Sequence, residues 1–145
     1  MNLLNKRIFM GADHAGYKTK EVVYDYLKGL GLDIEDLGTY SEDPVDYPDY
    51  AHKLARAMED ADHNLGILIC GTGIGMSIAA NRHRDIRAAL CHNKEYAKLA
   101  RQHNDANVLV LGGRYLNTFE TIEIVETFIN TEFLSGRHSS RVVKI

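Results

Sequence analysis

The sequence predicts one α/β domain, built on a doubly wound parallel sheet of five strands with helices on both faces. Five short, mostly apolar runs alternate along the chain with segments of helical periodicity, and this alternation is typical of a parallel sheet. The chain has 145 residues, of which 45% are hydrophobic. That length and composition suit a single domain over residues 1–145 with a core of its own.

The first half of the chain holds two predicted strands and two predicted helices. Residues 6–10 form the first strand, and a turn at residues 11–16 leads into a helix over residues 17–30. Residues 32–37 alternate between polar and apolar side chains and predict the second strand. A polar loop with two prolines follows, and then a helix over residues 49–62 with its apolar side chains on one face.

The second half of the chain repeats the alternation of strand and helix. Residues 65–69 are a continuous apolar run, which predicts a buried strand. After a glycine-rich turn, a helical pattern begins at Met76 and runs to Ala80. The remaining elements are two strands, each followed by a helix, and a C-terminal tail: 86–91, 94–102, 108–111, 118–130 and 131–145.

Chemically reactive side chains follow four of the predicted strands. Asp13 and His14 come after the first strand, and Cys70 ends the third. His92 follows the fourth strand, and Arg114 follows the fifth. Because ligands of open α/β sheets bind at the carboxyl ends of the strands, we expect an acid, an imidazole, a thiol and a guanidinium at one edge.

The turn after Cys70 has glycine at alternate positions, Gly71, Gly73 and Gly75. Such a turn lets the backbone bend sharply and bring several N–H groups toward one point, to which a helix N-terminus adds positive potential. This arrangement suits a phosphate or an enolate-like oxyanion, and a helix N-terminus favours the thiolate form of cysteine. The alternative is an ordinary strand-to-helix turn with a small buried cysteine.

Each polar candidate outside this turn has a functional and a structural interpretation. Asp13 can contact a sugar hydroxyl or cap a helix, and His14 can hold a phosphate, move a proton or be merely exposed. His103 and Asn104 follow the last turn of the fourth helix. They are either catalytic groups or an ordinary C-terminal cap of that helix.

The tail carries two arginines, and three further histidines fall on predicted helices or at their ends. Arg137 and Arg141 stand four residues apart, so a helical tail places both guanidiniums on one face, where a pair suits a phosphate dianion. His52, His63 and His83 fall on predicted helix faces or ends, and we expect them to be solvated.

Composition narrows the classes of partner and compartment. The net charge is −3 with no basic block, which argues against nucleic acid or an anionic membrane surface as a partner. No apolar run approaches the roughly 18 residues of a membrane span. Cys70 and Cys91 make no disulfide framework and are expected as reduced thiols of a cytoplasmic protein. No metal-ligand spacing is present, so no metal is expected.

Six motifs stand along the chain in a fixed order. They are GADHAG at 11–16, VDYPDY at 45–50, CGTGIGMS at 70–77, AAN at 79–81, HNDAN at 103–107 and GRHSSR at 136–141. In this order they resemble the type B ribose-5-phosphate isomerases, a family shared with the subunits of galactose-6-phosphate isomerase. The resemblance runs from about residue 7 to residue 143.

The resemblance implies a Rossmann-like α/β/α subunit and a homodimer whose active sites use residues of both chains. The tail at 131–145 then completes the site or the dimer, and whether dimers pair into tetramers stays open. The implied activity is the interconversion of ribose 5-phosphate and ribulose 5-phosphate in the pentose phosphate pathway, without metal or cofactor.

The same resemblance assigns roles to individual residues. His103 with Asp13 opens the furanose ring, Cys70 moves a proton from C2 to C1 through a cis-enediolate, and Thr72 helps to move the proton between the two oxygens. The implied phosphate-binding, sugar-binding and enediolate-binding residues are His14, Tyr47, Gly71, Gly73, Gly75, Ser77, Asn104, Arg114, Arg137 and Arg141.

Other functions fit the sequence less well. A hexose phosphate such as allose or galactose 6-phosphate remains an alternative substrate. A cysteine phosphocarrier is the alternative outside the enzymes, although in those carriers the cysteine closes the first strand and not the third. A low-molecular-weight phosphatase needs arginine six residues after the thiol, where this chain has Met76. A nucleotide-binding module needs a Gly-x-Gly-x-x-Gly motif after the first strand and an acidic residue at the end of the second, and this chain lacks that combination.

Overall fold

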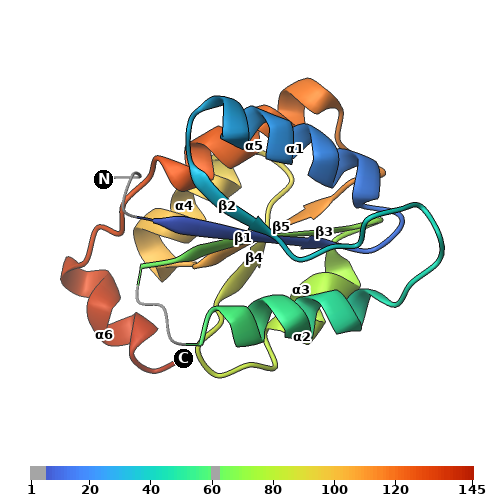
Figure 1. The fold of residues 1–145 in the computed structure, drawn as a ribbon. Coiled ribbons are helices and arrows are strands. Elements are labelled where there is room, and N and C mark those ends of the chain that lie inside the picture. The colour runs from blue at the N-terminus through green and yellow to red at the C-terminus, as the bar shows by residue number, and fades with distance from the viewer. Residues whose placement is uncertain (1–5, 60–62) are drawn as a thin grey trace.

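Five parallel strands form a sheet in the computed structural model, which describes residues 6–59 and 63–145 (Figure 1). The strands are β1 (Arg7–Ala12), β2 (Asp33–Asp36), β3 (Leu65–Cys70), β4 (Ala88–Leu90) and β5 (Val108–Gly112). They lie in the order β2-β1-β3-β5-β4, and every neighbouring pair is parallel. The predicted five-stranded parallel sheet is confirmed.

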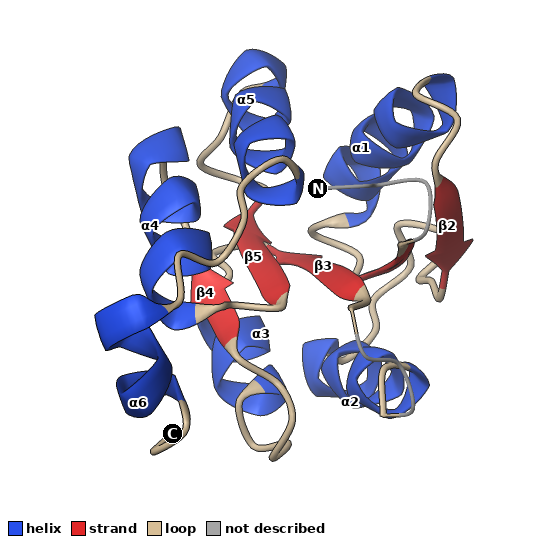
Figure 2. Cartoon of the chain, turned by 90° about the vertical axis from the view of Figure 1, so that its left-hand side faces the viewer, coloured by secondary structure: helices blue, strands red, loops and turns tan. Residues whose placement is uncertain are grey.

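Helices cover both faces of the sheet (Figure 2). They are α1 (Tyr17–Gly29), α2 (Tyr47–Ala57), α3 (Ile74–Ala80), α4 (Lys94–Asn104) and α5 (Thr118–Ile129), followed by a 3-10 turn, η2 (Gly136–His138), and α6 (Ser139–Val142). One face packs against α1, α4 and α5, and the other packs against α2 and α3. The α/β/α layering is therefore as predicted. In the described part of the chain, no helix is long and apolar enough to cross a bilayer.

The central strand β3 is buried along its whole length. It pairs with β1 on one side and with β5 on the other, and each fully buried Leu or Ile stabilises the fold by about 1.5–3 kcal/mol. Ala12 lies opposite Ile69, and Cys70 lies opposite Gly112. The register therefore brings the carboxyl ends of β1, β3 and β5 side by side.

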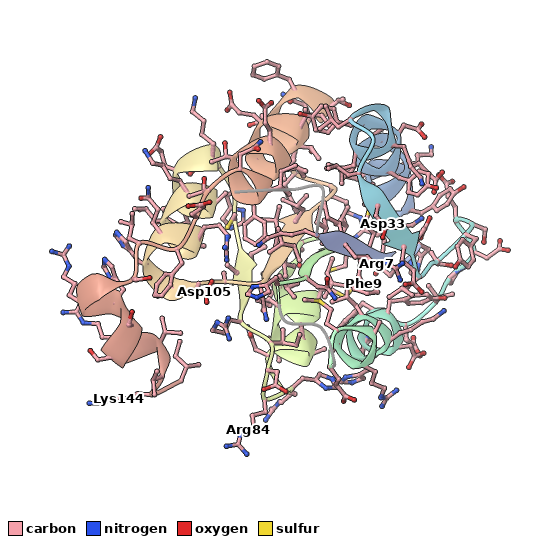
Figure 3. The ribbon with its side chains drawn as sticks, turned by 60° about the vertical axis from the view of Figure 1, so that its left-hand side comes forward. Arg7, Phe9, Asp33, Arg84, Asp105 and Lys144 are labelled. Atoms are coloured by element: carbon pink, nitrogen blue, oxygen red, sulfur yellow. The ribbon has the colours of Figure 1, made fainter. Side chains whose placement is uncertain are left out.

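Ion pairs join β1 and its surroundings to β2 at both ends of the strands. At the beginning of the strands, Arg7 Nε donates to Asp33 Oδ2 at 2.9 Å, and both side chains are exposed (Figure 3). At the end of β2, Asp36 accepts a 2.6 Å hydrogen bond from Lys20 Nζ, and Lys20 is fully buried. Burial acts to lower the pKa of Lys20, but its hydrogen bonds to Asp36 and Glu21 outweigh this effect and raise it.

The boundaries of α2 and α3 differ most clearly from the prediction. The helix predicted over 49–62 begins at Tyr47, because proline at position 48 is compatible with a first helical turn, where its missing N–H costs nothing. It ends at Ala57, and residues 60–62 of the predicted helix lie outside the described residues. The following helix, α3, begins at Ile74 and not at Met76, because Gly73 in the left-handed conformation, at φ +82°, ends the turn earlier.

The prediction that His52 and His83 are solvated is wrong, whereas His63 is exposed as expected. His52 Nδ1 lies 2.7 Å from His83 Nε2, and both side chains are half-buried. The packing of α2 against α3 brings together two residues that are 31 positions apart. Burial, together with the nearby charges of His52 and Arg56, lowers the pKa of His83 from its ordinary value, while Glu59 opposes the shift.

The histidine pair predicts a loss of stability in mild acid. Because the pKa of His83 is lower in the folded chain, the unfolded chain takes up a proton first as the pH falls through about 6.5. We expect the melting temperature to fall between about pH 7.5 and pH 5.5, and to fall less in His83→Gln. Thermal unfolding across this range measures the effect, with His63→Gln as the exposed control. Equal slopes for wild type and His83→Gln would contradict the prediction.

Candidate active site

One group of predicted site residues lies at the carboxyl edge of the sheet. Asp13 and His14 directly follow β1, Cys70 ends β3, and Arg114 comes two residues after β5. From β1 the chain moves outward to β2 on one side of the sheet. After β3 it moves to the other side, first to the edge strand β4 and then to β5 between β3 and β4. The ends of β1 and β3 therefore form the switch point at which open α/β sheets bind ligands.

The glycine-rich loop is folded around the sulfur of Cys70. The N–H of Gly73 donates to Cys70 Sγ at 3.2 Å, and Thr72 Oγ1 accepts from the N–H of Ile74 at 3.1 Å. Ser77 turns its hydroxyl back to donate to the carbonyl of Ile74 at 2.7 Å. Since Gly73 provides no side-chain cap, further N–H groups of the first turn of α3 remain available to a ligand.

Two side chains lie directly over this loop, and glycine is what lets them approach. A Cβ atom at Gly71 would lie 2.9 Å from Nη1 of Arg114, and one at Gly75 would lie 2.5 Å from Cζ of Tyr47. The guanidinium of Arg114 and the phenol of Tyr47 therefore lie against the loop that follows Cys70. Both were predicted site residues, and the structure brings them to the same loop.

Asp13 and His14 are held in place by backbone contacts. Asp13 is buried, and its Oδ1 accepts from the N–H of Gly16 at 3.0 Å, so that it also caps the turn before α1. His14 Nδ1 accepts from the N–H of Val45 at 3.1 Å. The same nitrogen lies 3.2 Å from the carbonyl of Val45, so the main chain of Val45 holds the ring at Nδ1 in either tautomer. The contact with Val45 joins segments 31 residues apart, and no local pattern in the sequence indicates it.

A second group of predicted site residues lies at the opposite edge. His103 and Asn104 end α4, which runs against the direction of the strands. Shortly afterwards the carbonyl of Asn107 accepts from the N–H of Gly66, near the beginning of β3. Cys70 lies at the other end of that strand, about 13 Å further along. One chain therefore does not bring His103 and Cys70 together.

The C-terminal tail joins this second group. Arg137 lies on η2 and Arg141 on α6, which form the helical part of the tail. A hollow of about 390 Å³ has His103, Asn104, His138 and Arg141 in its lining. His138 is buried and stacks on His103, with ring centroids 4.3 Å apart and planes at 15°. Burial and the nearby charges of His103, Arg137 and Arg141 lower the pKa of His138. No pattern in the sequence indicates the contact between His138 and His103.

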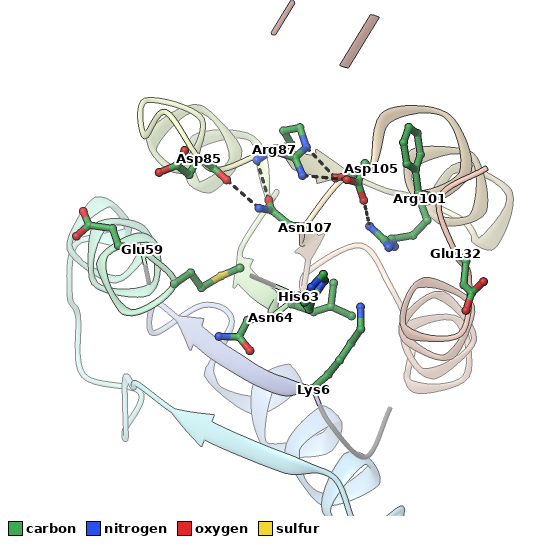
Figure 4. Close-up of a pocket in the computed structure, with 13 residues that line it drawn as sticks. Lys6, Glu59, His63, Asn64, Asp85, Arg87, Arg101, Asp105, Asn107 and Glu132 are labelled. Carbon is green, nitrogen blue, oxygen red and sulfur yellow. Dashed lines mark hydrogen bonds and ion pairs between the residues drawn. The ribbon is translucent and has the colours of Figure 1, made fainter. Parts of the chain in front are cut away.

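A cavity of about 760 Å³ also opens at the amino edge (Figure 4). Three of its charged residues pair with one another: Asp105 accepts from Arg101 at 3.0 Å and from Arg87 at 3.3 Å. Asn107 Nδ2 donates to the carbonyl of Asp85 at 2.8 Å. This network braces the turn after α4, and none of the residues predicted for the site lines the cavity.

The two cysteines differ in their surroundings. Both are free and buried, but only Cys70 faces the glycine-rich loop. Burial raises the pKa of Cys91 to about 12, which keeps it a neutral thiol. Over the residues that the structure describes, no group of three His, Cys, Asp or Glu side chains is arranged to hold a metal ion.

A thiol above a glycine-rich loop, at the switch point of a parallel sheet and beside an imidazole and a guanidinium, defines an α/β enzyme suited to a small anionic substrate. The profile of the Ribose/Galactose Isomerase family matches residues 8–145. The chain belongs to this family and is an isomerase. Membership in a family of isomerases does not fit the phosphocarrier alternative.

Known relatives resemble the chain along nearly all of its length. The ribose-5-phosphate isomerase B of Escherichia coli is 41% identical and covers 97% of this chain and 94% of its own. The structure of a ribose 5-phosphate isomerase from Thermotoga maritima superposes with a TM-score of 0.93, at 52% identity and 95% coverage of both chains. The Mycoplasma genitalium ribose-5-phosphate isomerase B, solved with bound ribulose-5-phosphate, gives a TM-score of 0.93 at 40% identity, covering 97% of this chain and 94% of its own.

The close approaches to glycine predict different effects at two positions. In Gly75→Ala the new methyl group meets the ring of Tyr47, which is exposed and can swing away, so we expect unchanged melting but lower activity. In Gly112→Ala the methyl group would lie 2.6 Å from the carbonyl oxygen of Thr72, which is backbone and cannot move freely. We expect a loss of about 1–3 kcal/mol there. Denaturant unfolding compares the two variants, and equal destabilisation would contradict this account.

Proposed function

We propose that this isomerase interconverts ribose 5-phosphate and ribulose 5-phosphate. The observation that carries the proposal is its similarity to the Mycoplasma genitalium enzyme that was solved with bound ribulose-5-phosphate. The chain also has the thiol, the glycine-rich loop and the arginines of the tail that this reaction needs. A cytoplasmic location, expected from its two unpaired cysteines, is part of the same proposal.

Cys70 is the base in this proposal. Interconversion of an aldose and a ketose removes a proton from C2, beside the carbonyl carbon, and returns it at C1 through a cis-enediolate. The thiolate of Cys70 takes and returns that proton, and Thr72 helps to move a proton between O1 and O2. The N–H groups of residues 71–77, including those of Gly71, Gly73, Gly75 and Ser77, hold the negative charge that develops on the oxygen. The hydrogen bond from Gly73 to Sγ supports this assignment, since a thiolate accepts such bonds well.

The phosphate is bound by groups of both edges. His14 and Arg114 lie at the carboxyl edge, and Arg137 and Arg141 lie on the tail. Val45 holds His14 at Nδ1, so Nε2 is the nitrogen that can donate to a phosphate oxygen when it carries a proton. The guanidiniums supply paired donors and positive charge for the dianion.

The sugar is opened and held between the same two groups. Asp13 and His103 open the furanose ring, and Tyr47 and Asn104 line the site. The position of Tyr47 over Gly75 supports its place beside the reacting carbons.

A homodimer that shares its sites explains why the predicted residues lie at opposite edges. The hollow beside His103 cannot face Cys70 of the same chain, but it can face Cys70 of a second copy. Ile74 and Ile78 on α3 are more than half exposed, as are Val143 and Ile145 at the C-terminus. Exposed apolar side chains next to both half-sites are suited to burial between two copies.

A hexose phosphate is the second candidate substrate, because the family description names galactose as well as ribose. A panel of ribose 5-phosphate, allose 6-phosphate and galactose 6-phosphate, assayed for ketose formation after treatment with EDTA, decides between them. Fastest turnover of ribose 5-phosphate supports the proposal. Preference for a hexose phosphate overturns the pentose assignment, and no turnover of any of them overturns the function.

Replacement of the thiol tests the role of Cys70. In Cys70→Ala we expect kcat to fall by at least about 100-fold, the lower range for loss of a positioned base, while the sugar phosphate still binds. Steady-state kinetics and calorimetric titration measure the two properties. Cys91→Ala is the matched control, since that buried thiol lies away from the loop and should leave kcat near wild type. Wild-type turnover in Cys70→Ala removes the residue from the base role.

Mixing of two inactive variants tests whether both chains build each site. Cys70→Ala and His103→Ala damage different edges, so a mixed dimer has one site with both defects and one site with neither. Random pairing should restore roughly a quarter of wild-type activity. Size-exclusion chromatography confirms exchange of subunits, and activity is assayed before and after it. If exchange occurs without recovery, the sites are not shared.

A further inference from the structure

We propose that Lys20 and Asp36 are positioning residues, a buried ion pair that holds His14 and the loop at 37–46 in the arrangement that meets the phosphate. This inference deepens the proposed function and rests on it. Neither residue lies among the predicted site residues, and neither touches Cys70 or the glycine-rich loop in any described contact.

The ammonium group of Lys20 is enclosed on all sides. Its side chain is 0% exposed, and Nζ donates to Asp36 at 2.6 Å and to Glu21 at 3.0 Å. The rings of Tyr17 and Tyr40 lie 5.5 Å and 5.7 Å from the same nitrogen. A charge so deeply buried is tolerated only when it is paired, which fixes the position of Asp36.

Asp36 in turn organises the chain after β2. Its Oδ1 accepts from the N–H of Gly38 at 2.9 Å, and its main-chain carbonyl accepts from the hydroxyl of Tyr40 at 2.8 Å. Asp36 therefore binds Lys20 through Oδ2 and holds the first residues of the loop through Oδ1 and its main-chain carbonyl. The loop then continues to Val45.

The loop is fastened to the residue directly before Asp13. The N–H of Ala12 donates to the carbonyl of Gly38 at 2.8 Å, and the N–H of Thr39 donates to the carbonyl of Ala12 at 2.8 Å. Further along, Val45 fixes His14 through its N–H. Lys20 also belongs to the first turn of α1, which begins after the same Asp13–Gly16 turn. The ion pair therefore fixes both sides of the segment that carries His14.

A purely structural role predicts a different result on substitution. Loss of hydration offsets most of the attraction in a buried ion pair, so apolar residues of similar size often replace such a pair without loss of stability. We therefore expect Lys20→Met with Asp36→Leu to lose no stability from the ion pair itself, although it also loses the acceptor of the Gly38 N–H. Lys20→Met with Asp36→Asn keeps an acceptor for Gly38 and is the second variant, should the first fail to fold.

Kinetics and phosphate binding test the positioning role. In the double variants we expect KM for ribose 5-phosphate to rise about tenfold, as for loss of one hydrogen bond to a charged group, with kcat within about twofold of wild type. Inhibition by inorganic phosphate should weaken by the same factor. The control is Arg7→Gln with Asp33→Asn, which removes the exposed ion pair at the other end of the same strands and should change neither constant. Wild-type KM and phosphate inhibition in both double variants would overturn the inference.

Nitrogen NMR of the histidine rings separates this inference from the proposed function. Val45 faces Nδ1 of His14 with both its N–H and its carbonyl. His14, identified by its absence in His14→Gln, should therefore show one fixed tautomer in the wild type and an average of two tautomers in the double variants. An unchanged His14 tautomer overturns the positioning role. Failure of the wild type to isomerise ribose 5-phosphate overturns the proposed function and leaves the NMR result to decide the inference.

Discussion

The parallel pairing of β3 with both β1 and β5 is the constraint on which the carboxyl edge depends. Because Ala12 lies opposite Ile69 and Cys70 lies opposite Gly112, the three strands end level with one another. The segments that follow them must then share a small space, in which a Cβ atom at Gly112 would lie 2.6 Å from the carbonyl oxygen of Thr72. Backbone geometry thus requires glycine around the thiol before any ligand is considered.

The sheet and this edge were predictable because the relevant signals are local. Each strand is a short apolar run between helical segments, and parallel strands put their carboxyl ends at one edge. The positions of Asp13, Cys70 and Arg114 follow from these two facts. The start of α2 was not predictable in the same way, since Pro48 is compatible with a loop and with the first turn of a helix.

Contacts between distant segments could not be predicted from one sequence. Lys20 shares the buried face of α1 with Val23 and Leu27, and the burial of its charge becomes favourable only because Asp36 arrives from β2. The contact between His52 and His83 depends in the same way on the packing of α2 against α3. The stacking of His138 on His103 needs the tail to fold back onto the end of α4. Each contact depends on tertiary structure that no periodic pattern describes.

The placement of Cys70 and His103 at opposite ends of β3 has a genetic consequence in the proposed dimer. A chain with both residues defective would still pair with an intact chain, and the mixed dimer would have one site without the thiol and one without the imidazole. Such an allele is dominant over the intact copy, because an intact chain that pairs with a defective one has no complete active site. A lesion at only one edge leaves one working site in every mixed dimer, and it is therefore recessive in comparison.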